Sequence, residues 1–392
     1  MKRNQHKKLK LGMKLLSFLN KYKGAPLCAV VVLLSYMLTL IFYPIVSKNE
    51  ILGSLVGAIN DSWYMDCFFN KKNKSNQIIK NDDIYIIDIK DSYSSRDSIA
   101  NVIKKVSQQK PRLICVDFEF SDNITYDSAK TKYLKKTLLE VKDSTKLAIV
   151  AYKGFSNDLP KNSFIDSLNI DFGLSDELTY PEYTAYISGN YPRISTKIVE
   201  MLGVDTKTLP DRFVVNYRNK AYRKIPIRHT SNLIQITDKL TDKIILIGEY
   251  DSPQDIHPLS FNYKGRKQVP GIEMIANEVC SLLSYNKNQK YYSPYTYYGW
   301  MYNFFFYLLL SIIYVVVLHL FSFIRIKLPF KMMLRFVILL LAEYGLILLF
   351  MCVTEKCMMI PNIVLFVSSI FLINPIYEIL FTLNHKQNEA KN

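Results

Sequence analysis

Four long apolar segments constrain the fold of this 392-residue chain more than any other feature of its sequence. The first, residues 25–46, holds no charged side chain over roughly 22 residues, enough for a helix to cross a hydrocarbon core of about 30 Å. Three more follow near the carboxyl end, at about 300–324, 336–353 and 358–383. We therefore predict four α-helical transmembrane spans, the first an uncleaved anchor and the last three a bundle within residues 299–383.

Basic residues beside these segments predict their orientation. The net charge is +16, and residues 1–24 are rich in lysine and contain no acidic side chain. The loop 325–335 is also basic. Loops with such an excess stay in the cytoplasm, so we expect a multi-pass protein of a bacterial cytoplasmic membrane, with residues 1–24 and 384–392 inside and residues 47–298 outside. Positive charge placed beside the spans indicates the lipid bilayer as a partner and does not indicate nucleic acid.

Residues 47–298 have the pattern of an α/β domain. Their apolar runs are too short to cross a membrane, and strand-like runs alternate with helical ones, which indicates a parallel sheet. The expected strands are 83–89, 112–120, 146–152 and 243–250, and the expected helices are 94–109, 128–143 and 271–284. We therefore predict an extracytoplasmic domain with a mixed, mainly parallel sheet and flanking helices.

Three further expectations concern parts of this domain. The segments 212–217 and 223–228 are short enough to pair as antiparallel strands, and the polar segment 70–77 has the composition of a solvated loop. The six cysteines include no CxxC pair, so neither a zinc site nor a disulfide framework is indicated. A disulfide between Cys67 and Cys280 is the pairing that stays open.

Acidic residues stand at or just after the carboxyl ends of the expected strands. They are Asp88, Asp91, Asp117, Glu119 and Asp255. Ligands bind at that edge of open α/β sheets, so these acids are candidates to bind calcium, magnesium or an amine. The alternative is that each acid caps a helix or orders a turn through bonds to the nearby backbone.

Catalytic motifs are absent from the sequence. There is no GxxxxGK[ST], GxSxG or HExxH, and only His229 and His257 fall within residues 47–298, which excludes a multi-histidine zinc site there. We therefore expect no catalytic residue, no cofactor and no enzymatic activity, while the identity of any metal stays open. A metal-dependent envelope enzyme built on the acidic edge is the alternative.

Glu343 lies in the middle of the third apolar segment, where a charged carboxyl costs about 2.5 kcal/mol or more. A rise of about 1.5 Å per residue from the cytoplasmic ends of the spans places Glu343, His319 and Asn374 at similar depths. We predict that these three residues form one polar cluster. The cluster either holds the helices together or relays a proton or a signal.

Four segments follow one another between the first apolar segment and the bundle. They are DDIYIIDIKD (82–91), KPRLICVDFEFSD (110–122), LTDKIILIGEYDSPQDIHP (240–258) and VPGIEMIANEVCSLL (269–283). With these flanks they resemble the CHASE type-2 family, the cyclase and histidine-kinase associated sensory extracellular domains. The resemblance implies that the outer domain senses a signal, and it adds Glu273, in its helix start, to the candidate ligand-binding residues. Ile275 stands where relatives often carry histidine.

The sequence as a whole favours a membrane sensor without a fused effector. In the family the signal passes to a fused kinase, cyclase or phosphodiesterase, whereas only residues 384–392 follow the last expected span here. We expect an unknown extracytoplasmic ligand as the signal, and a separate signalling protein or a second copy of the chain as the receiver. The other interpretation is a scaffold of an envelope complex that binds no small ligand.

Overall fold

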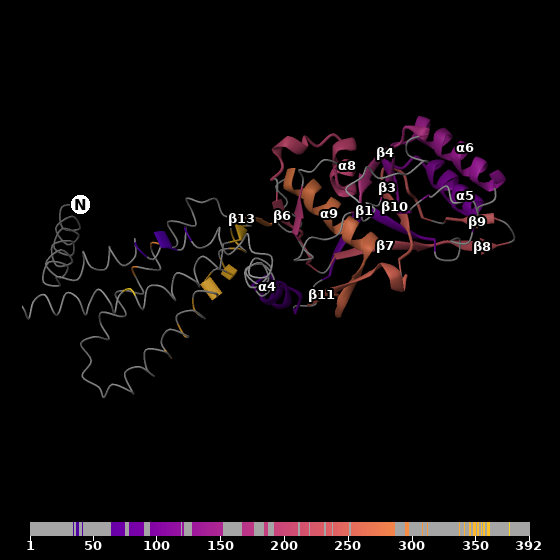
Figure 1. Cartoon of the computed structure of the whole chain (residues 1–392). Helices are drawn as coiled ribbons and strands as arrows, with labels where there is room; N and C mark the ends of the chain where they lie inside the picture. The colour runs from indigo at the N-terminus through magenta and orange to yellow at the C-terminus, as the bar shows by residue number, and fades with distance from the viewer. Residues whose placement is uncertain are drawn as a thin grey trace, which may run out of the picture. The chain divides into compact units, whose positions relative to one another are not determined.

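The computed structural model describes residues 64–74, 78–89, 95–118, 120, 128–151, 167–175, 184–186, 192–210, 212–218, 220–230, 233–236, 238–250, 252–286 and 295–297, with isolated positions elsewhere. The chain divides into two compact units, one of which is Met65–Thr296 and the other Met1–Tyr64 with Tyr297–Asn392. The fold described below is that of the unit Met65–Thr296 (Figure 1).

A six-stranded sheet forms the centre of this unit. Its strands are, in spatial order, β4 (Asp171–Leu174), β3 (Leu147–Ala151), β2 (Leu113–Val116), β10 (Ile244–Gly248), β1 (Ile79–Asp88) and β7 (Lys220–Pro226). Every neighbouring pair is parallel. All residues of β2, β3 and β10 are buried, as expected when helices cover both faces of a parallel sheet. The prediction of a mainly parallel sheet is confirmed.

Two pairs of helices flank the sheet. α5 (Arg96–Ser107) and α6 (Ser128–Ser144) share one hydrophobic core with alternate residues of the strands. α8 (Ile194–Met201) contacts β3 and β4, while α9 (Gly271–Asn286) contacts β1 and β10. Figure 1 shows α8 and α9 together, away from α5 and α6. Because successive side chains of a strand point to opposite faces, each pair of helices buries its own set of strand residues.

The remaining elements are short. They are α4 (Tyr64–Asn73), η3 (Thr206–Thr208), η4 (Pro253–Asp255), β5 (Thr184–Tyr186), β6 (Arg212–Val214), β8 (Arg228–Thr230), β9 (Leu233–Gln235), β11 (Ile256–Tyr263), β12 (Arg266–Pro270) and β13 (Tyr295–Tyr297). β14 (Met359–Ile360) belongs to the other unit. The pairs β11–β12 and β8–β9 are antiparallel, and β6 pairs antiparallel with both β5 and β13.

A two-residue turn joins β11 to β12. Tyr263 pairs with Arg266, and φ is 52° at Lys264 and 81° at Gly265. Two consecutive residues with positive φ are characteristic of the type I′ turn, whose twist matches that of a hairpin. Gly265 adopts this conformation readily, whereas the left-handed region costs a residue with a Cβ about 1–2 kcal/mol. The side-chain contacts of Lys264, given below, offset that cost.

Two of the sequence-based expectations are wrong, and the disulfide left open between Cys67 and Cys280 is not formed. β6 and β7 do not pair with each other, because β7 extends the central sheet beside β1. The first four residues of the expected loop 70–77 are the last turn of α4, because the buried Asn73 amide donates to two backbone carbonyls. Cys67 and Cys280 are both free thiols, and Cys280 Sγ instead lies 3.2 Å from the Asn81 amide nitrogen.

The expected spans 25–46, 300–324, 336–353 and 358–383 lie outside the described residues, apart from isolated positions. Within the described part of the chain, no helix is both long enough and apolar enough to cross a membrane. The three residues of the expected polar cluster, His319, Glu343 and Asn374, are also outside the described residues. The spans and the cluster therefore stay predictions.

Candidate functional site

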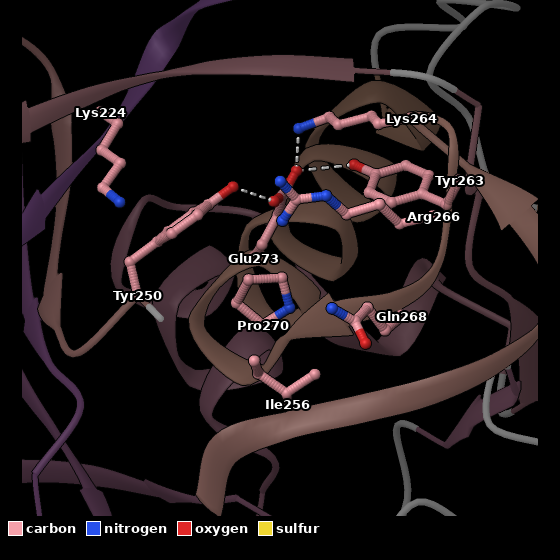
Figure 2. A pocket seen from close by; sticks show the side chains of 9 residues that line it. All are labelled: Lys224, Tyr250, Ile256, Tyr263, Lys264, Arg266, Gln268, Pro270 and Glu273. Carbon is pink, nitrogen blue, oxygen red and sulfur yellow. Dashed lines mark hydrogen bonds and ion pairs between the residues drawn. The ribbon is translucent and has the colours of Figure 1, made fainter. Parts of the chain in front are cut away.

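A pocket of about 390 Å³ opens beside the β11–β12 hairpin (Figure 2). It is lined by Lys224, Tyr250, Ile256, Tyr263, Lys264, Arg266, Gln268, Pro270 and Glu273. Lys224 comes from β7, Tyr250 follows β10, Glu273 lies in the first turn of α9, and the hairpin supplies the others. The pocket therefore lies where the hairpin meets the carboxyl ends of two strands of the central sheet, β7 and β10, and the start of α9.

Glu273 forms the buried part of the pocket wall, with 1% of its surface exposed. Tyr250 Oη donates to its carboxylate at 2.6 Å, Tyr263 Oη donates at 2.9 Å, and the Lys264 ammonium forms an ion pair with it (Figure 2). Two hydroxyl donors and one cation satisfy the carboxylate, which offsets the cost of removing its charge from water. The Glu273–Lys264 pair also ties the hairpin turn to α9.

The Tyr263 hydroxyl joins the hairpin to the same face of α9. Burial, and then the negative charge of Glu273, raise the pKa of the Tyr263 phenol well above its usual range, so it remains a hydrogen-bond donor. The Asn277 side-chain amide donates back to the Tyr263 oxygen at 3.2 Å. Because Glu273 and Asn277 are four residues apart on a helix, both reach the same side chain of the hairpin.

Cations outnumber carboxylates around the pocket. Lys224 Nζ lies 3.0 Å from Asp88 Oδ2 and 4.0 Å from the centre of the Tyr250 ring, and Lys264 pairs with Glu273. Arg266 is exposed, and its guanidinium has no ion-pair or hydrogen-bond partner among the residues that the structure describes. The pocket is therefore electropositive, and one of its cations is open to a ligand.

Asp88 is the candidate acid that lies next to the pocket without lining it. It is the last residue of β1, and 11% of its side chain is exposed. In addition to the ion pair with Lys224, its Oδ1 accepts a hydrogen bond from the backbone N–H of Tyr250 at 3.3 Å. Asp88 therefore positions two residues of the pocket wall.

Asp117 and Asp255 lie against glycines at other places. A Cβ on Gly248 would come within 3.1 Å of Asp117 Cβ, so the Asp117 side chain packs against the end of β10. A Cβ on Gly271 would come within 2.6 Å of Asp255 Cγ, so that carboxylate lies against the first residue of α9. A carboxylate at a helix amino terminus is favoured by the helix dipole, which agrees with the capping alternative for Asp255.

A metal site is not formed by the described part of the chain. There, no three His, Cys, Asp or Glu side chains come close enough together to hold a metal ion. Asp255 instead lies 3.3 Å from the His257 ring nitrogen, and Asp91 and Glu119 lie outside the described residues. Of the six candidate acids, the structure brings Glu273 into the pocket and Asp88 beside it. Ligand binding by Glu273 or Asp88 stays a prediction.

The cations of the pocket, together with Tyr250 and Tyr263, are not predicted by any periodic pattern in the sequence. Lysine and arginine in a polar stretch are usually solvated, so composition did not separate Lys264 and Arg266 from other basic residues. The available signal was the Lys264–Gly265 pair between two strand-like runs, because a residue followed by glycine at that place favours a two-residue hairpin. A hairpin would have placed both cations at one end.

The hairpin also contacts α4. The Asn73 amide donates to the carbonyl oxygen of Asn262 at 2.7 Å, and the backbone N–H of Asn262 donates to Asn70 Oδ1 at 2.8 Å. The rings of Phe69 and Phe261 are 4.8 Å apart between centroids, and both are fully buried. Asn262 and Phe261 directly precede Tyr263, so one strand contacts α4 and lines the pocket.

Comparison with known proteins gives one match. A family model described as the CHASE2 domain matches residues 51–316, which include the whole unit Met65–Thr296. No curated protein and no solved structure matches the chain.

Proposed function

Because this chain belongs to the CHASE2 domain family, a family of sensory extracellular domains, we propose that it is a membrane sensor whose signal is a small molecule bound in the hairpin pocket. The main domain lies outside the cytoplasmic membrane, the four expected spans hold it there, and both ends of the chain are cytoplasmic. The observation that carries the proposal is that Glu273 of the pocket lies on α9, which leads toward the second expected span, while the hairpin contacts α4, which follows the first.

The first connection runs through α4. The expected span 25–46 precedes α4 in the sequence, and α4 is held by the hairpin through Asn73, Asn70 and Phe69. A shift of the hairpin on ligand binding would change these contacts. The first span would then receive the change through the chain that joins it to α4.

The second connection runs through α9. Glu273 lies in the first turn of this helix, and β13 follows the helix along the chain, just before the expected span that begins at about residue 300. A ligand that changes the contacts of Glu273 therefore acts on the helix that leads to the second span. The ligand shifts the balance between two arrangements of the hairpin and α9. The change passes through α4 and α9 to the spans, and from there to a separate partner or to a second copy of the chain.

Hydrogen exchange of the full chain in lipid nanodiscs tests this coupling without knowledge of the ligand. We compare the wild type with Glu273→Gln, which removes the charge, and with Tyr250→Phe, which removes one donor and keeps the side-chain volume. Glu140→Gln, on the exposed face of α6, is the matched control. We expect faster exchange in α4 and β13 in both pocket variants and no change in the control. Changes confined to the hairpin and the first turn of α9 would contradict coupling and favour a scaffold.

Topology has its own test. A reporter that is active only outside the membrane, fused after Asn392, should give no signal, whereas the same reporter inserted between residues 154 and 158 should be active. Activity of the fusion after Asn392 would contradict the arrangement of four spans.

A further inference from the structure

We propose that the ligand of the hairpin pocket is a small oxyanion, a carboxylate or a phosphate, which binds to Arg266 with support from Lys264 and Lys224. This inference rests on the proposed function, because it assigns the chemistry of the ligand to the same pocket. It differs from the interpretation that the strand-edge acids bind a metal or an amine.

The state of the single carboxylate argues against a cationic ligand. Glu273 already accepts from Tyr250 and Tyr263 and pairs with Lys264, and it is almost fully buried. An amine or a metal ion would have to displace Lys264 to reach it, and would do so beside two further cations. Repulsion between like charges therefore opposes the binding of a cation in the pocket.

The state of the cations favours an anion. Arg266 has no partner for its guanidinium among the described residues, and it projects from β12 at the pocket (Figure 2). The planar guanidinium presents paired donors that match a carboxylate or a phosphate. Gln268, two residues along the same strand, lines the pocket as well, and its amide adds a neutral donor on the same face of β12.

The size of the pocket limits the ligand to a small molecule. A volume of about 390 Å³ is near the lower end of the range of small-molecule sites, which is about 300–1,000 Å³. A free phosphate or a short dicarboxylate fits this volume together with water. The Gln268 amide supplies a polar contact that orients such a ligand beside its charged group.

Titration calorimetry of the full chain in nanodiscs tests the proposal, with succinate, citrate, inorganic phosphate and sulfate as anions and putrescine and calcium as cations, at constant ionic strength. We expect saturable binding of at least one anion and none of either cation. Binding of succinate or citrate alone identifies a carboxylate site, and binding of phosphate or sulfate alone identifies a phosphate-type site. No binding of any of the four anions at millimolar concentration, or binding of putrescine or calcium in the pocket, would overturn the proposal.

Arg266→Gln locates the bound anion. Loss of a charge-assisted contact should weaken anion binding about tenfold to a hundredfold. Arg266→Lys keeps the charge but loses the paired donors of the guanidinium, so its affinity for the anion should lie between those of the wild type and Arg266→Gln. Lys267→Gln is the matched control, because Lys267 is exposed on the same strand and does not line the pocket. Equal weakening in Lys267→Gln and Arg266→Gln would assign the effect to surface charge and contradict the site. The hydrogen-exchange experiment on Glu273→Gln uses no ligand. Its result on coupling therefore holds even if calorimetry finds no anion bound to the pocket.

Discussion

The acids at the carboxyl edge of the sheet and the side chains of the hairpin pocket use charge in opposite ways. Asp88 is paired with Lys224 and bonded to the backbone of Tyr250, and Asp255 lies against the start of α9. Arg266, by contrast, has its guanidinium open to the pocket. A charge that the local structure satisfies holds the fold together, whereas a charge left open at a pocket is available to a ligand. The acids of the strand edge are satisfied in this way. The hairpin holds a charge of each kind, because Lys264 is paired with Glu273 and Arg266 is open to the pocket.

The largest expected effect is on stability, at the buried acid of the pocket. Glu273→Leu leaves two buried or half-buried phenols without their acceptor and removes the partner of Lys264, so we expect a loss of about 3 kcal/mol in the free energy of unfolding. Thermal unfolding of the full chain, followed by tyrosine fluorescence, measures it. Glu200→Leu, on the exposed face of α8, should change stability by less than about 0.5 kcal/mol. An equally small effect at Glu273 would mean that its bonds add nothing to the fold.

A second effect concerns Lys220, a fully buried residue on the same strand as Lys224. Burial lowers the pKa of the Lys220 ammonium below its usual 10.5. The unfolded chain therefore binds more protons than the folded one between the lowered pKa and 10.5, so stability rises with pH across that window. We expect Lys220→Met to raise stability by about 1–2 kcal/mol at pH 7 and by less at pH 10.

Melting temperatures at the two pH values measure this difference. Lys105→Met, on the exposed face of α5, is the matched control and should show no dependence of its effect on pH. A gain in Lys220→Met that is the same at pH 7 and pH 10 would contradict a lowered pKa.

A third effect separates the two regions directly. Asp88→Asn removes a negative charge beside the pocket, so we expect anions to bind about twofold to fivefold more tightly, because Lys224 is then less neutralised. If Asp88 were itself a ligand for a cation, the same change would abolish binding of that cation and leave anions unaffected. Calorimetry with an anion that binds the wild-type chain decides between the two outcomes.

The smallest effect is expected at Asp255. Its carboxylate lies against Gly271 at the start of α9, where the helix dipole makes a negative charge worth about 0.3–1 kcal/mol. Asp255→Asn should lower stability by that amount and leave anion binding unchanged. A large loss of anion binding in this variant would show that the strand edge and the pocket are one site.

The buried elements of the domain could be predicted from the sequence, because burial produces uninterrupted apolar runs in strands and a periodic apolar face in helices. The strands β2, β3 and β10 are apolar throughout, and α9 has a long apolar face, so each was located. β7 was assigned to the wrong partner, because a strand of mixed composition joins whichever edge the tertiary structure offers. The loop expected at 70–77 includes Asn73, which lies in α4 because its side chain bonds to residues far along the chain. Local composition does not predict such bonds.

The candidate site was predicted only in part. Acids after strands are visible in a sequence, and Glu273 came from the resemblance to the family. The pocket itself depends on the turn at Lys264 and Gly265, which brings Arg266 beside a helix that begins after β12. Charged residues of a turn have no periodic pattern, so their approach to one another is a property of the tertiary structure.

A buried contact holds α9 halfway along its length. Glu278 is bonded to Arg193 at 2.7 Å and to Ser195 at 2.6 Å, and 3% of its side chain is exposed. At about 1.5 Å per residue, this contact is about 7.5 Å from Glu273 and about 12 Å from Asn286 along the helix axis. A tilt of α9 about this contact would displace its far end more than its pocket end, and in the opposite direction.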